Sequence, residues 1–219
     1  MGLSREEEYE LAKQRDYPID KLTPPVILDL EDPLDLGLVN GKCKWAPGLI
    51  PGAENEGLEA GKFIEAPPRL ADFDDSMWDT PRNIREVIGT GLTFAWYRFT
   101  IELPKTVKDL DVGGAQIWFE TCADDYGEIW VDAIPFHWEI NPEIRAVYHP
   151  GHAISSNRLS PVQGWNTPNR IMITDNAEPG RRHVIACLAI NAPFGQPGGG
   201  VFLRYARLEI SQSLARIPT

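Results

Sequence analysis

Four side chains that can exchange protons or bind a metal lie near one another in the middle of the sequence. His137 and Glu139 form a His-x-Glu pattern, and His149 and His152 form a His-x-x-His pattern that begins ten residues later. Imidazole and carboxylate groups exchange protons near neutral pH, and both bind zinc, iron or manganese. The pattern therefore indicates acid-base or substrate contacts first, and a metal site second. The alternative is a polar loop whose histidines bond the neighbouring backbone.

Aromatic and amide side chains surround this pattern. Aromatic rings stack on the apolar face of a sugar or on another ring, while amides hydrogen-bond hydroxyl groups. The asparagines are also typical of ordinary turns, so both interpretations stay open. The residues predicted to contact a ligand are Trp138, Trp165, Asn166, Asn169, Tyr126 and Tyr148.

Asp124 and Asp125 are adjacent carboxylates in a predicted turn. Calcium prefers hard oxygen ligands, and such a pair supplies two or three of the roughly 6–8 that it needs. The alternative is a turn in which the aspartates bond their own backbone. Calcium at this aspartate pair is the cofactor that we predict from the sequence.

The elements that must position these residues are β-strands. Trp96–Leu103 alternates, with Tyr97 and Phe99 on its apolar face, and His183–Ile190 is apolar on both faces, which predicts a central strand. No long amphipathic helix is evident after residue 20. The predicted fold class is therefore all-β, a β-sandwich of jelly-roll type. Further strands are predicted at Ala115–Cys122, Glu128–Ala133, Asn169–Thr174 and Val201–Ile210.

Two regions are expected along the chain. Residues 1–69 are predicted to form an acidic helix at 5–15 and a proline-rich extended arm, with strands at 26–30 and 62–65, that packs on the core. Residues 70–219 are predicted to form the jelly-roll domain. The connection at 134–168 is longer than most loops and too rich in aromatic residues to be a disordered one. We expect it to fold over the sandwich as the wall of a pocket.

Composition excludes several classes of function. The chain has 219 residues and a net charge of −11, which argues against a basic nucleic-acid-binding face. No apolar run is long enough to span a membrane, and the start is not a signal peptide. The cysteines show no metal-binding spacing and are expected to be buried free thiols in the cytoplasm. These cysteines are Cys43, Cys122 and Cys187.

Two motifs resemble the N-terminal sugar-binding domain of family 2 glycoside hydrolases. They are Phe73-Asp-Asp-Ser-Met-Trp78 and Trp96-Tyr-Arg-Phe-Thr-Ile-Glu-Leu-Pro104. The resemblance spans residues 70–210 and implies a galactose-binding-like β-jelly roll. The catalytic barrel of that family is absent, and Asp132-Ala133 replaces the Asn-Gly of the family pattern. The resemblance therefore implies sugar binding without that family's catalytic carboxylates.

A shorter stretch, Ala123–Asp132, is similar to the Asp-Asp hairpin of PA14 domains. In lectins of that type the paired aspartates hold a calcium ion that also coordinates sugar hydroxyls. This similarity implies the same role for Asp124 and Asp125.

Two functions follow from these observations. The first is a protein that binds a carbohydrate or other polyhydroxylated, sugar-like or aromatic small molecule, as an accessory to an enzyme partner. The alternative is a stand-alone hydrolase, lyase or hydratase, with Glu139 or His137 as base and His149 or His152 as acid. A partner-binding role through the acidic arm is the remaining interpretation. The arginine-rich second half also suggests contacts in a homo-oligomer.

Overall fold

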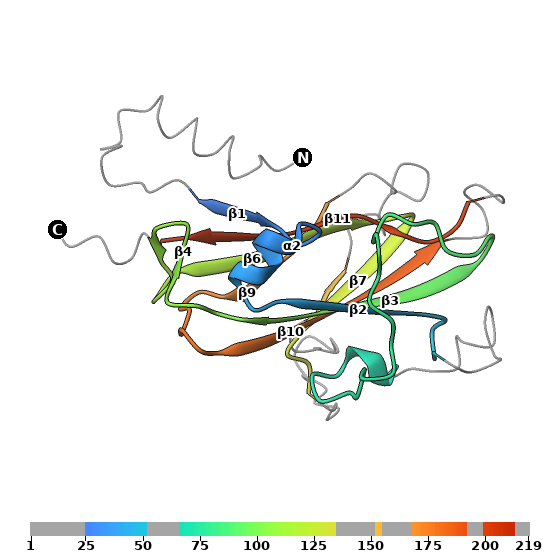
Figure 1. Cartoon of the computed structure of the whole chain (residues 1–219). Helices are drawn as coiled ribbons and strands as arrows, with labels where there is room; N and C mark the ends of the chain where they lie inside the picture. Colours follow the sequence, from blue (N-terminus) through green and yellow to red (C-terminus); the bar gives the residue numbers. More distant parts are fainter. Residues whose placement is uncertain (1–24, 52–65, 135–151, 155–167, 192–198, 213–219) are drawn as a thin grey trace, which may run out of the picture.

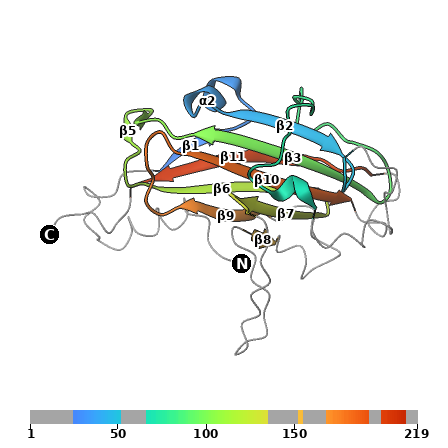
Figure 2. The same cartoon turned by 90° about the horizontal axis from the view of Figure 1, so that it is seen from below.

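The computed structural model describes residues 25–51, 66–134, 152–154, 168–191 and 199–212. Two antiparallel sheets pack face to face as a β-sandwich (Figure 1, Figure 2). This confirms the predicted all-β fold class. The predicted helix at 5–15 and the predicted strand at 62–65 lie outside the described residues.

The first sheet has four strands in the order β1-β11-β6-β9. All neighbouring strands pair antiparallel, and a bulge between Leu203 and Ala206 interrupts the pairing of β11 with β6. The strands are β1 (Val26–Asp29), β11 (Leu203–Ser211), β6 (Gln116–Ala123) and β9 (Asn169–Thr174).

The second sheet has five strands in the order β2-β3-β10-β7-β8. Strand β10 pairs with β3 on one side and β7 on the other, which confirms the central position predicted from its apolar sequence. The strands are β2 (Lys42–Pro47), β3 (Thr93–Glu102), β10 (Arg182–Asn191), β7 (Tyr126–Val131) and β8 (His152–Ile154). The smaller elements are the helix α2 (Pro33–Leu38), the 3-10 helix η3 (Pro67–Arg69) and the ribbon of β4 (Thr106–Val107) and β5 (Leu110–Asp111).

The core lies between the two sheets and follows the two-residue period of the strands. Tyr97, Phe99 and Ile101 point inward from β3, and Ile117 and Phe119 point inward from β6. The rings of Phe99 and Phe119 meet across the core, with their centroids 5.5 Å apart. Burial of this face leaves the alternate residues of β3 on the outer side of the five-stranded sheet.

The segment before residue 70 supplies an edge strand to each sheet. Strand β1 pairs with β11 and confirms the strand predicted at 26–30, whereas β2 pairs with β3 and was not predicted. Between them Asp32 caps the N-terminus of α2, because its Oδ1 accepts a hydrogen bond of 2.9 Å from the Leu34 amide. This part of the predicted arm is therefore built into the sandwich. The division of the chain at residue 69 stays a prediction.

The long connection at 134–168 contains a short strand. Residues 152–154 form β8 and pair antiparallel with β7, so they extend the edge of the five-stranded sheet. The prediction that this connection forms a pocket wall concerns residues that are mostly outside the described ones. In the described part of the chain, no helix is long and apolar enough to cross a membrane.

Candidate functional site

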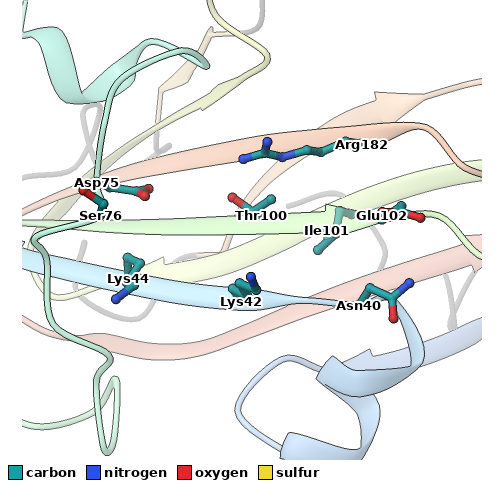
Figure 3. A pocket seen from close by; sticks show the side chains of 9 residues that line it. All are labelled: Asn40, Lys42, Lys44, Asp75, Ser76, Thr100, Ile101, Glu102 and Arg182. Atoms are coloured by element: carbon teal, nitrogen blue, oxygen red, sulfur yellow. The ribbon is translucent and has the colours of Figure 1, made fainter.

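A cleft of about 430 Å³ lies on the outer face of the five-stranded sheet (Figure 3). Strands β2, β3 and β10 form its floor, and the segment after η3 and the turn after α2 form its sides. Of the predicted ligand-binding and metal-binding residues whose side chains the structure describes, none lines it. All but one of its lining residues are polar, so it suits a polar ligand. The lining residues are Asn40, Lys42, Lys44, Asp75, Ser76, Thr100, Ile101, Glu102 and Arg182.

Strand alternation and register bring these side chains together. On β2 the even-numbered residues face outward, because the odd-numbered Cys43 belongs to the core. Lys42 lies opposite Thr100 on β3, and Glu102 lies opposite Arg182 on β10. Three strands that are distant in sequence thus contribute polar groups to a single surface.

A buried arginine holds the segment that forms one side of the cleft. The Arg98 side chain is 2% exposed, and its Nε donates to Asp75 Oδ2 at 2.7 Å. Its Nη1 donates to the carbonyl of Pro68 and, at 2.9 Å, to that of Leu70. Its Nη2 donates to the carbonyl of Phe73 at 3.3 Å. Carboxylate and carbonyl oxygens thus solvate the buried guanidinium in place of water.

A second cation helps to position the same segment. Lys44 lies directly opposite Arg98, and two like charges in that position repel each other. Asp75 offsets this repulsion, and Lys44 Nζ donates to the carbonyl of Trp78 at 2.8 Å. Four carbonyls of this segment therefore bond one of two cations, which fixes its path; they belong to Pro68, Leu70, Phe73 and Trp78.

These contacts explain the motif around Phe73. The rings of Phe73 and Trp78 pack with their centroids 5.4 Å apart, and the Arg98 guanidinium lies over the Phe73 ring. Hydrogen bonds from the backbone and side chain of Ser76 lower the pKa of Asp74. The motif therefore shapes the turn beside the cleft and joins it to β3.

An apolar cluster covers the neighbouring part of the same sheet face. The indole rings of Trp96 and Trp130 lie 5.7 Å apart and pack with Ala186 and Leu188. Trp96 Nε1 donates to the carbonyl of Leu49 at 2.9 Å. Both strand tryptophans are buried and pack on the outer face of the sheet. Arg98 lies between this cluster and the cleft.

Asp124 and Asp125, the predicted calcium ligands, form the corner where the chain passes from β6 in one sheet to β7 in the other. Burial, and then the charge of Asp125, raise the pKa of Asp124. Asp125 has a φ of 56°, in the left-handed region that Asp tolerates in turns. Among the described residues, no group of three or more His, Cys, Asp or Glu is placed to hold a metal ion. The geometry favours the turn interpretation, and the calcium site stays a prediction.

Two predicted ligand contacts lie at the same corner. Asn169 is 4% exposed, and its Nδ2 donates to the carbonyl of Gly127 at 3.2 Å, joining β9 to β7. The Tyr126 hydroxyl donates to the carboxylate of Glu128. Tyr126 pairs with Ile190, at the far end of β10 from Arg182. That length of strand is about 26 Å, so this corner is separate from the cleft.

The other predicted site residues cannot be compared with the structure. Only the backbone of His152 is described, in β8 opposite Trp130. The predicted acid-base and ligand residues outside the described ranges are His137, Trp138, Glu139, Tyr148, His149, Trp165 and Asn166.

A carboxylate-imidazole pair that sequence reasoning missed lies at the end of β7. His183 Nδ1 is 2.6 Å from Asp132 Oδ2, and the Val184 amide donates to Asp132 Oδ1 at 2.8 Å. Burial raises the pKa of Asp132, but the hydrogen bonds from His183 and Val184 outweigh it and lower the pKa overall. His183 is 1% exposed, and its Nε2 has no hydrogen-bond partner among the described residues. The available signal was Asp132 itself, at the position where the sugar-binding motif that the sequence resembles has Asn.

No family model and no curated protein matches the chain.

Proposed function

We propose that this protein is a binding module for a polyhydroxylated, sugar-like small molecule. The supporting observation is the polar cleft over β2, β3 and β10. Its volume of about 430 Å³ lies within the range of small-molecule sites, roughly 300–1,000 Å³.

The chemistry of the cleft suits hydroxyl groups. A hydroxyl both donates and accepts hydrogen bonds, so it needs partners of both kinds. Lys42 donates, Glu102 accepts, and the Thr100 hydroxyl and the Asn40 amide do both. Three of these four residues lie on strands of the sheet, so their backbone positions are fixed before a ligand binds.

The sandwich is compatible with the galactose-binding-like jelly roll that the sequence resembles, and we propose this relationship together with the sugar-like ligand. We also propose a role as an accessory to an enzyme. The three cysteines are buried free thiols, as predicted, which supports our proposal of a reducing, cytoplasmic location.

Calorimetric titration with a panel of neutral sugars and polyols tests the proposal. We expect dissociation constants in the micromolar to millimolar range. Thr100→Val removes a hydroxyl from the middle of the cleft and should weaken binding about 3- to 10-fold, the value of one hydrogen bond.

Thr106→Val is the matched control, because Thr106 is exposed on β4 and does not line the cleft. Its affinity should equal that of the wild type. Failure of every sugar to bind below about 10 mM would refute the proposed function. Equal affinity of the Thr100 variant and the wild type would refute the cleft as its site.

A further inference from the structure

We infer that the sugar-like ligand of the cleft has an acidic group, a carboxylate or a phosphate, which binds between Lys42 on β2 and Arg182 on β10. The inference rests on the proposed function and names the class of ligand more closely.

The cleft has an excess of positive charge in a strongly acidic protein. Lys42, Lys44 and Arg182 line it, and none of them forms an ion pair with a carboxylate among the described residues. Asp75 is the partner of the buried Arg98, which leaves Glu102 as the only carboxylate of the lining without a cation. The three cations and two carboxylates give the lining a net charge of +1, whereas the whole chain has a net charge of −11. A local excess of positive charge in a concave site favours an anionic ligand.

The register of the sheet gives these cations a common target. Lys42 lies opposite Thr100, and β3 separates β2 from β10. Adjacent strands are about 4.8 Å apart, so β2 and β10 are separated by roughly 10 Å. Long side chains from both strands can therefore reach one anion above β3. The Thr100 hydroxyl lies between them and adds a third donor.

Arg182 points toward this target rather than toward its cross-strand neighbour. Figure 3 shows its guanidinium extended along the sheet toward Thr100, whereas the carboxylate of Glu102 points the other way. A guanidinium presents parallel N–H groups that match the two oxygens of a carboxylate or phosphate. Its planar fork thus suits an acidic group held over the centre of the cleft.

A matched series of ligands tests the inference. Glucose, glucuronate and glucose 6-phosphate share a ring and differ at carbon 6, and calorimetry would give the affinity of each for the whole chain. We expect at least one acidic sugar to bind at least tenfold more tightly than glucose in 100 mM salt. In 1 M salt the Debye length falls from about 10 Å to about 3 Å, so this preference should shrink.

Variants locate the preference. Arg182→Gln should reduce it to less than about threefold. Arg181→Gln should leave it unchanged, because Arg181 is exposed, lies next to Glu178 at 3.6 Å and does not line the cleft. Both variants remove the same charge from adjacent positions, so the comparison separates a local contact from the net charge. Inorganic phosphate and acetate, used as competitors, should bind more weakly than the preferred acidic sugar.

The remaining outcomes refute either this inference or the proposed function. Equal binding of neutral and acidic sugars would refute the inference while the proposed function stands. A preference that survives in Arg182→Gln, or that Arg181→Gln abolishes equally, would also refute it. If no sugar binds, or if the simple anions bind as tightly as the acidic sugars, the proposed function itself fails.

Discussion

Replacing Arg98 with Met should destabilise the protein by about 3–5 kcal/mol, the usual cost of breaking a buried ion pair. The change removes the donor of bonds to one carboxylate and three carbonyls, although Met retains much of the apolar volume. Asp75 is 25% exposed and can regain water, which keeps the loss near the lower end. A domain of ordinary stability, about 5–15 kcal/mol, should still fold in the cold.

Equilibrium unfolding in urea measures this loss. Arg85→Met is the matched control, because Arg85 pairs with Glu31 through hydrogen bonds of the same kind but its side chain is 55% exposed. Exposed pairs contribute about 0–1 kcal/mol, so the control should lose no more than that. The two variants could unfold at the same urea concentration and with the same dependence of the unfolding free energy on urea. In that case the contacts of Arg98 would not stabilise the segment after η3 as described.

Two further predictions concern buried titratable groups. The pKa of Asp132 is lower in the folded state than its value of about 3.9 in the unfolded chain. The negative charge of Asp132 therefore stabilises the fold at a pH above about 3.9. This stabilisation is lost as the pH falls through the folded pKa. Asp132→Asn should therefore cost on the order of 1 kcal/mol at pH 7 in thermal or urea unfolding, and this cost should shrink as the pH falls below about 4; a difference that is independent of pH would contradict this assignment. Burial raises the pKa of Cys122 to about 11 and also raises that of the other two thiols, so a thiol reagent at pH 8 should label the three cysteines rapidly only after denaturation. Rapid labelling of one thiol in the folded protein would show that it is more exposed than described.

The strands of the core were predictable because burial imposes a two-residue period on them. Tyr97 and Phe99 on β3 are inward-facing, and the apolar run of β10 takes the central position that its two buried faces require. Strand β2 was missed although Lys42 and Lys44 alternate with Cys43 and Trp45. The surrounding prolines suggested an arm, but they lie outside or at the end of the strand, where they remove no required hydrogen bond.

The cleft could not be predicted from local sequence, because its residues meet only through the register of three strands. Nothing near Lys42 in the sequence indicates that Thr100 lies opposite it, and nothing indicates that Arg182 lies one strand further on. The sequence instead predicted a calcium ligand at Asp124 and a ligand contact at Asn169, because carboxylate and amide side chains commonly have these roles. Their side chains belong to a corner between sheets, and the pattern of residue types does not distinguish that role from binding.

Arg98 connects the stability of the sandwich to the shape of the candidate site. On one side of Arg98, the outer face of the sheet is apolar and buried, and Trp96 and Trp130 form the centre of this apolar part. On the other side of Arg98, the same face is polar and forms the cleft. A segment held by apolar contacts alone would pack against Trp96 and Trp130. It would then form no side of the cleft beside Lys44. The guanidinium instead holds three carbonyls of this segment and the carboxylate of Asp75 at the boundary. The buried charge that costs desolvation energy is therefore also the feature that keeps one side of the cleft in place.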